Sequence, residues 1–399
     1  MTHHGRSFPA RHPRLLRALN DRAALELLLA RGPLTRSQLG ELTGLSKVTA
    51  SQLVERLEER GLVRRVGEQA GGRGPNAQLY NVAPNSAYVV GVEVGDEHVV
   101  AACADITGAV VGRVEVSTKP DANGGGEDPV RLVHNAVVQA AEQAGASLGD
   151  VRRIVLGTPG LVDPNTGDIV FAFNLPRWQR GLAAALRDDL HTTIVFENDV
   201  NLAAVAESHA GAAREVGDFL LVWIGQGVGL AVMLGGRLHR GTAGAAGEIG
   251  YLPVPGADIP REVSRRGKGA FQQVAGADAV RQVAREHGFR SGTAAEAVKA
   301  AIAAGTKGGP VLDEVARRLA LGVAASCIVL DPPLVVLAGE VGAAGGTPLA
   351  ERVQHEVAAI SPVAPRVVVT GVADEPVLQG ALLTALDAVR DEVFGSTVD

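Results

Sequence analysis

The 399 residues are enough for two or three domains, and the 46% apolar content provides a sizeable core although only 3% of the residues are aromatic. No apolar run reaches the roughly 18 residues of a membrane span, and the N-terminus lacks a signal-peptide segment, so we expect a cytoplasmic protein with no membrane partner. The 50 glycines follow no period, which excludes collagen-like and repeat folds. Cys103 and Cys327 lie in apolar segments and are interpreted as buried thiols.

Charge is distributed unevenly along the chain. Residues 1–83 contain 13 Lys and Arg against 7 Asp and Glu, a net charge of +6, whereas residues 84–399 contain 25 against 37, a net charge of −12. A basic segment attracts phosphate, and the overall charge of −6 conceals this segment. We therefore predict a DNA-binding domain at residues 1–83 and a larger domain at residues 84–399.

The basic segment has the pattern of a helix-turn-helix. A first helix is predicted over about residues 20–30. Thr35 and Gln38 then have capping-box spacing at the start of a second helix. Gly44 tolerates the positive φ that ends this helix, and Ser46 is a suitable N-cap for a third.

The third helix has two different faces. Its inward stripe is apolar and consists of Leu53, Val54 and Leu57. Its other face carries small or polar groups that can approach base edges, namely Lys47, Thr49, Ala50, Ser51 and Gln52. We expect the bases to be read by Ser46, Lys47, Thr49, Ser51 and Gln52.

Two short strands, residues 62–66 and 78–82, follow the third helix and are joined by a glycine-rich loop. Arg73 lies in this loop, where it suits the tip of a wing that enters a narrow minor groove. Arg36 and Arg56 are expected to hold phosphate. The segment therefore predicts an α+β winged helix-turn-helix domain. The alternative is a small helical protein-interaction module, but caps, turn, wing and charge all favour DNA.

The larger domain begins with a β-meander and continues with alternating helices and strands. The meander is predicted at residues 88–94, 98–106 and 109–116. Helices are then predicted at residues 129–144, 182–190 and 200–211, and strands at 194–197, 219–224 and 230–234. This order predicts an α/β fold of two similar lobes with a cleft between them, and a last helix at residues 377–393 that packs back on the first lobe.

Several motifs together resemble the ROK family (repressors, open reading frames and sugar kinases), in particular its transcription-factor branch. They are ARGPLTRSQLGELTGLSKVTASQLVERL in the basic segment, GTPGLVD at 157–163, NLPRW at 174–178, ENDVNLAAVAE at 197–207, GQGVG at 225–229 and LHRGTAGAAGEIG at 238–250. The resemblance covers nearly the whole chain. It implies an actin-like, hexokinase/RNase H-like body whose interlobe cleft binds a sugar.

The resemblance also implies which residues contact the sugar. Asn174, Asn198, Asp199 and Glu248 match the family's amide and carboxylate contacts, which suit the hydroxyls of a sugar. Asp199 matches the general base of the kinases and is interpreted as vestigial here. Two plainer interpretations stay open. Asn198 and Asp199 could cap the following helix, and Asn174 could be a turn residue.

The phosphate-binding segments depart from the kinase pattern. The second loop, GQGVG, keeps its glycines, although Gln226 replaces the usual hydroxyl residue. The first loop reads Glu93-Val94-Gly95-Asp96-Glu97-His98, where kinases of the family have an Asp-x-Gly-Gly-Thr-like run. The Asp96 and Glu97 carboxylates would repel a triphosphate at short range. We therefore predict that ATP is not used and that the protein is not an enzyme.

The family's zinc site is also expected to be absent. Tyr251 occupies the position of its histidine, and residues 261–276 contain no cysteine, so Ala270 stands where the last thiol would be. Gln272 replaces a glutamate that contacts sugar in relatives. Tyr251 and Gln272 can still form hydrogen bonds, so they are retained as sugar-contact candidates. No metal or other cofactor is expected.

These observations predict a transcriptional regulator, most simply a repressor of carbohydrate-metabolism genes. A homodimer or homotetramer would bind a palindromic double-stranded DNA operator, and a sugar or sugar derivative would change its DNA affinity by changing the closure of the lobes. Two alternatives compete: an active ATP-dependent sugar kinase with a DNA-binding head, and a ligand-independent regulator whose body only oligomerises.

Overall fold

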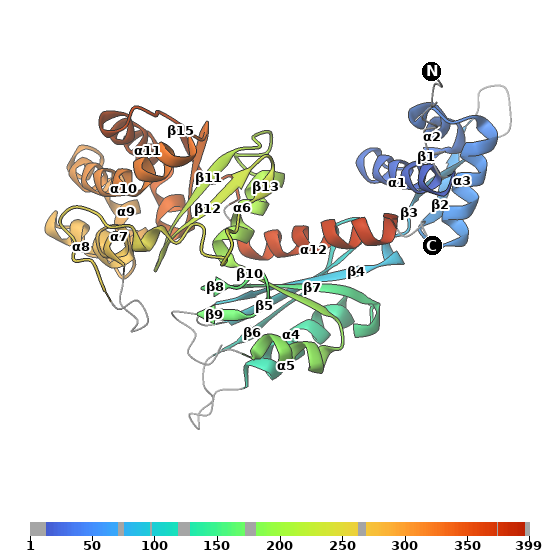
Figure 1. Ribbon diagram of the computed structural model, residues 1–399, viewed down its shortest axis with the longest axis horizontal. Coiled ribbons are helices and arrows are strands. Elements are labelled where there is room, and N and C mark those ends of the chain that lie inside the picture. The colour runs from blue at the N-terminus through green and yellow to red at the C-terminus, as the bar shows by residue number, and fades with distance from the viewer. Residues whose placement is uncertain are drawn as a thin grey trace, which may run out of the picture.

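The computed structural model describes residues 13–70, 76–95, 98–118, 128–171, 181–261, 269–372 and 374–395, which form a small head and a two-lobed body (Figure 1). The head contains α1 (Pro13–Arg31), β1 (Leu34–Thr35), α2 (Arg36–Thr43), α3 (Lys47–Glu59), β2 (Val63–Gln69) and β3 (Ala77–Val82). Its three antiparallel strands are ordered β1-β3-β2. Within the described ranges, no helix is both long and apolar enough to cross a bilayer.

Local signals account for most of the head. Thr35 and Gln38 form the predicted capping box around the start of α2, with hydrogen bonds of 3.2 and 2.8 Å. Gly44 has a φ of 71° and ends α2, and Ser46 caps α3, as predicted. The first helix begins at Pro13 and not near residue 20, and it packs on α12, which lies at the other end of the chain.

The first lobe of the body is built on a five-stranded sheet of order β10-β7-β4-β5-β6. Its strands are β4 (Tyr88–Val94), β5 (His98–Asp105), β6 (Val110–Ser117), β7 (Val151–Thr158) and β10 (Thr193–Asn198). The antiparallel β4-β5-β6 meander was predicted from sequence, and β7 and β10 extend it in parallel. A hairpin of β8 (Leu161–Val162) and β9 (Ile169–Phe171) leads from β7.

The two faces of this sheet have different covers. The helices α4 (Pro129–Gln143) and α5 (Leu182–Leu190) lie below the sheet in Figure 1 and bury one apolar cluster against it. The last helix, α12 (Pro376–Gly395), crosses the other face, as predicted, and packs on β4 and on α6 (Asp199–Ala210). The packing of α12 on α6 is close, because a methyl group at Gly380 would collide with the Leu202 carbonyl group.

The second lobe repeats the plan with a sheet of order β13-β12-β11-β14-β15. Its strands are β11 (Phe219–Ile224), β12 (Val228–Leu234), β13 (Arg237–Leu238), β14 (Leu334–Ala338) and β15 (Arg366–Val369). Its helices are α7 (Ala270–Ala275), α8 (Ala277–Glu286), α9 (Ala294–Ala303), α10 (Gly309–Leu330) and α11 (Gly339–Ile360). The second lobe also contains the 3-10 turns η3 (Ile249–Tyr251) and η5 (Gly305–Lys307). Two further 3-10 turns, η1 (Pro84–Ser86) and η2 (Leu148–Asp150), precede strands β4 and β7 of the first lobe.

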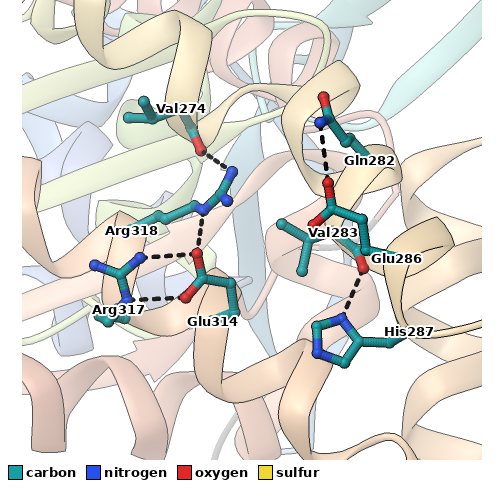
Figure 2. Close-up of polar contacts among 8 residues, drawn as sticks. All are labelled: Val274, Gln282, Val283, Glu286, His287, Glu314, Arg317 and Arg318. Atoms are coloured by element: carbon teal, nitrogen blue, oxygen red, sulfur yellow. Dashed lines mark hydrogen bonds and ion pairs between the residues drawn. The ribbon is translucent and has the colours of Figure 1, made fainter. Parts of the chain in front are cut away.

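A polar network joins the helices of the second lobe (Figure 2). Glu314 on α10 accepts hydrogen bonds from Arg317 and from Arg318, with distances of 2.6–2.8 Å. Arg318 also donates to the Val274 carbonyl group of α7 at 3.4 Å. The hydrogen bonds from Arg317 and then Arg318 lower the pKa of Glu314 to about 2. Glu314 therefore holds Arg318, and it is Arg318 that links α10 to α7.

The head and the body share one apolar core. Leu25, Leu28 and Leu57 of the head belong to the same buried cluster as Val389 and Phe394 of α12. Polar contacts border this core, because Arg22 Nη2 lies 2.6 Å from Asp391 Oδ1 and Arg60 Nη2 donates to the Val393 carbonyl group at 3.1 Å. The head is thus docked on the C-terminal end of α12 (Figure 1).

Candidate DNA-binding face and interlobe cleft

The N-terminal turns of α3 carry most of the predicted base-reading residues. Ser46 Oγ accepts a hydrogen bond from Thr49 N–H at 3.2 Å, and it lies 2.9 Å from Thr49 Oγ1. Both residues are exposed, yet each hydroxyl already has a partner in the other. Lys47 and Gln52 are exposed, whereas Ser51 is half-buried.

Two residues of α3 depart from the sequence interpretation. Ala50 was expected on the DNA-facing side, but it is 1% exposed. That expectation was wrong because Ala50 packs where α2 crosses α3, next to Gly40. The apolar Val48 was not among the residues predicted to contact DNA, yet its exposed fraction is 67%. An apolar residue in the middle of a polar, solvent-facing surface is the signal that could have identified it.

Arg36 and Arg56 have partners within the head. The Arg36 guanidinium lies 5.3 Å from the centre of the Tyr80 ring and 3.5 Å from Glu55. Arg56 forms two hydrogen bonds to Asp21, one of them at 3.1 Å from Nε, and Asp21 is fully buried. Since a buried carboxylate requires a charged partner, Arg56 holds the head together. Arg73 lies outside the described residues.

Two of the predicted sugar contacts of the body, Asn198 and Asp199, lie where β10 ends and α6 begins. Asn198 is the N-cap of α6, with its Oδ1 accepting from Asn201 N–H at 3.2 Å and its Nδ2 donating to the Gly160 carbonyl group at 3.0 Å. The capping interpretation of Asn198 is therefore confirmed. The capping role also fixes the position of the next residue, Asp199. Asn174 lies outside the described residues.

Asp199, Glu248 and Tyr251 form a partly buried group in this cleft. Burial raises the pKa of Asp199 to about 7, and the negative charges of Glu93 and Glu248 contribute further. Burial also raises the pKa of Glu248, and it raises that of Tyr251 together with the charge of Glu248. The structure thus brings together three of the predicted sugar contacts, which come from α6 and from the η3 segment.

A salt bridge next to this group was not foreseen from the sequence. Arg240 Nε donates to Glu197 Oε2 at 2.6 Å, and Asn201 Nδ2 donates to Glu197 Oε1 at 2.8 Å. Glu197 is 5% exposed and is the last residue but one of β10 in the first lobe, whereas Arg240 follows β13 of the second lobe. The pair therefore connects the two lobes next to Asn198 and Asp199.

The Gln272 side chain forms hydrogen bonds to the backbone of the second loop, GQGVG. Its Oε1 accepts from Val228 N–H at 2.6 Å, and its Nε2 donates to the Gln226 carbonyl group at 2.7 Å. The side chain thus anchors the loop, a role that the sequence did not suggest. A methyl group at Gly225 of this loop would collide with the Glu340 carboxylate, so Glu340 occupies the space beside the loop.

A cavity of about 270 Å³ lies between the lobes on the side of this loop. Three of its lining residues are acidic, namely Glu93, Glu340 and Glu375. Burial, and then the charge of Glu375, raises the pKa of Glu93. Asp96 and Glu97 lie outside the described residues. Across the described part of the chain, no three His, Cys, Asp or Glu side chains converge as a metal site would require.

Comparisons with known proteins agree with this geometry. The model of the ROK family matches residues 89–388, and that of the MarR family matches residues 11–74. The chain is 26% identical over 336 residues, 82% of each chain, to the DNA-binding transcriptional dual regulator NagC of Escherichia coli K12.

Two solved structures are similar in fold. A ROK family transcriptional regulator, homologous to the E. coli MLC protein, has a TM-score of 0.73 at 19% identity over 96% of this chain and 99% of that one. The ROK hexokinase from Thermus thermophilus has a TM-score of 0.63 at 29% identity over 76% of this chain and 99% of that one. The hexokinase match accounts for the body alone, whereas the regulator match includes the head.

Proposed function

Because the chain belongs to the ROK family, we propose that it is a DNA-binding transcriptional regulator whose kinase-like cleft senses a sugar or sugar derivative. Residues 1–83 form the DNA-binding part and residues 84–399 the sensing part. The observation that carries this proposal is the asymmetry of the cleft. One part of the cleft carries residues that suit sugar hydroxyls, whereas the part in which a kinase would hold phosphate is lined by carboxylates.

The head supports the DNA-binding role through its fold and charge. It is a winged helix matched by the MarR family model, and it carries the net charge of +6 in residues 1–83. Of the proposed base contacts of α3, Ser46, Lys47, Thr49 and Gln52 are exposed and Ser51 is half-buried. Arg36 and Arg73 are assigned to phosphate or the minor groove. Arg56 is left out of the DNA contacts because Asp21 holds its guanidinium.

Phosphoryl transfer from ATP is disfavoured by electrostatics. Glu93, Glu340 and Glu375 line the cavity in which a triphosphate would have to lie. Glu375 is paired with Arg113, so the repulsion would come mainly from Glu340, which stands beside Gly225, and from Glu93. The kinase alternative is tested by ATP turnover with a panel of hexoses, hexosamines and pentoses. Sugar-dependent ADP formation would contradict the proposal, and its absence in a preparation that binds DNA supports it.

The sugar would lie against Asp199, Glu248 and Tyr251, with Asn198 and Asn174 beside them. Carboxylates and a phenol offer acceptors and a donor to a ring of hydroxyls. Gln272 is assigned to the loop and not to the sugar, because both ends of its amide are bonded to the loop backbone. The Arg240–Glu197 pair would hold the lobes at a fixed distance around the sugar.

A continuous path leads from this cleft to the head. Asn198 and Asp199 start α6, and the buried Glu207 near its end accepts hydrogen bonds from Ala212 N–H at 2.7 Å and Val372 N–H at 3.0 Å, and from Thr370 Oγ1. Residues 370–372 lead into α12, on whose far end the head is docked. A sugar that moves α6 would therefore move the head. Coupling of about 1–3 kcal/mol between sugar and DNA is typical of such links.

The DNA partner is proposed to be a palindromic operator bound by a homodimer or homotetramer, because two heads related by a two-fold axis match such a site. The proposal is tested by selecting duplexes from a random pool, first without sugar and then with each sugar of the panel. Enrichment of a palindrome whose affinity changes with one sugar supports it. If a duplex is enriched but no sugar changes its affinity or raises the melting temperature of the protein, the result favours a ligand-independent regulator whose body only oligomerises.

A further inference from the structure

Val48 stands at the centre of the solvent-facing side of α3. The buried residues Ala50, Leu53, Val54 and Leu57 mark the inward side of this helix. At 100° per residue, Val48 points away from the middle of that set, and so does Gln52 one turn later. The exposed fraction of Val48 is 67%, the largest among the large apolar residues exposed in the described part of the head.

Neither packing nor helix formation explains a valine at this position. Its side chain is mostly in water, and a β-branched residue is a weaker helix former than the alanine or lysine that would also fit there. Some of the neighbouring polar groups already have partners within the helix, because the Ser46 and Thr49 hydroxyls are hydrogen-bonded to each other. Ser51 is half-buried. Val48 therefore shares the solvent-facing surface with the exposed residues Ser46, Lys47, Thr49 and Gln52.

We propose that Val48 is a specificity-determining residue that packs against the C5-methyl group of a thymine in the major groove of the operator. This inference rests on the proposed function, since it assumes that α3 enters the groove. Thymine is the base whose major-groove edge carries a methyl group, so an apolar side chain there selects thymine over cytosine, which lacks the methyl group. Gln52 lies on the same side of the helix and matches the N6 and N7 atoms of an adenine.

The test uses the full-length protein and the duplex selected as above. Each thymine of one half-site is replaced in turn by deoxyuridine, which removes only the methyl group. At one position in the half-site, the wild-type protein should lose about fourfold in affinity, equivalent to about 0.8 kcal/mol for one buried methyl-sized group. Val48→Ala should bind the thymine duplex more weakly and lose the difference between thymine and uracil at that position.

Two further variants make the result specific. Val48→Thr keeps one methyl group and should retain part of the discrimination. Val66→Ala removes another exposed valine of the head, on the β2 strand, and should leave the discrimination at the wild-type value. Melting temperatures of all variants check folding, and Val48→Ala should fold normally because the residue has little packing to lose.

Three outcomes would overturn the inference. In the first, the wild-type protein binds equally well when uracil replaces thymine at any position. In the second, Val48→Ala keeps the full discrimination between thymine and uracil. In the third, Val48→Ala has a different oligomeric state from the wild type, which would assign Val48 to a protein contact. The failure of the proposed function is a different result, because then no duplex is enriched at all.

Discussion

The head and the cleft differ in how far apart in sequence their functional residues lie. The surface of α3 is built within seven residues, Ser46 to Gln52, and its cap and turn are local. The cleft brings together Asp199, Glu248 and Arg240 from different segments, and its link to the head depends on Glu207 meeting residues 370–372. Local rules therefore determine the DNA-binding surface, whereas long-range packing determines the sensing site.

The largest expected effect tests the long-range part of this comparison. Glu207→Ala removes a buried carboxylate that accepts hydrogen bonds from the N–H groups of Ala212, Gly371 and Val372. Of these three donors, the Val372 N–H keeps a second acceptor in Thr370 Oγ1 at 3.2 Å. We expect the free energy of unfolding to fall by about 3–5 kcal/mol, because several hydrogen bonds to a charged group are lost and each contributes roughly 1.5–3 kcal/mol. Urea unfolding followed by circular dichroism measures this loss.

The matched control is Glu392→Ala, which removes an exposed carboxylate from α12 and should change the free energy of unfolding by less than about 0.5 kcal/mol. Equal effects of the two substitutions would show that Glu207 does not join α6 to the segment that leads into α12.

The second prediction concerns the sugar side of the cleft. Asp199→Asn should weaken binding of the sugar identified by thermal shift by roughly 10–100-fold, because a carboxylate that accepts hydrogen bonds from hydroxyls is lost. Since burial raises the pKa of Asp199 to about 7, the wild-type affinity should increase as pH rises from 6 to 8, as the carboxyl group ionises. Isothermal titration calorimetry at several pH values measures both effects.

In the Asp199→Asn variant, this pH dependence should be lost or strongly reduced. A variant that binds the sugar as tightly as the wild type would place the sugar elsewhere.

The third prediction concerns acid stability of the second lobe. The folded-state pKa of Glu314 is depressed to about 2, so its ion pairs stabilise the fold fully above its unfolded pKa near 4.5 and lose this contribution as pH falls toward 2. Over this window we expect the wild type to lose about 1–2 kcal/mol more than Glu314→Gln, after allowance for solvent screening. Chemical unfolding at pH 5, 4 and 3 measures the difference, and parallel curves for the two proteins would contradict it.

The smallest expected effect tests the local part of the comparison. Ser46→Ala removes the N-cap of α3 and should destabilise the head by about 1 kcal/mol, because the Thr49 N–H loses its acceptor. Ser46→Asp should restore most of the stability, since aspartate also caps helices. Thermal unfolding compares the three proteins. If Ser46→Asp were as unstable as Ser46→Ala, the cap would not be what stabilises this end of α3.

Sequence predicted the head well because its signals act over a few residues. The capping box of Thr35 and Gln38 and the αL glycine at Gly44 need no knowledge of the rest of the chain. The same reasoning failed for Ala50, because whether an alanine faces solvent depends on how closely α2 crosses α3. Nor does the sequence show that Asp21 is buried beside Arg56 and bonded to its guanidinium.

In the body, sequence predicted the first meander, the strands β10, β11 and β12 and the packing of α12 on the first lobe, but neither the strands β14 and β15 nor the partners of the cleft residues. The Glu197–Arg240 pair joins residues 43 positions apart across two lobes, and Gln272 reaches a loop 44 positions away. Glu340 lies far from the phosphate loops in sequence, so its place beside Gly225 becomes visible only in three dimensions. Such contacts depend on how the two sheets face each other, which no local pattern encodes.

We propose that a sugar bound in the cleft changes the DNA affinity of the head through the contacts that join α6 to α12. The most direct test of this proposal is the dissociation constant of the selected operator, measured by fluorescence anisotropy with and without saturating sugar, in the wild type and in Asp199→Asn. We expect the dissociation constant to change by roughly 5–150-fold in the wild type and not to change in Asp199→Asn, when both are measured at a sugar concentration that saturates the wild type but leaves the variant unoccupied. An operator affinity that is the same with and without bound sugar in the wild type would contradict it.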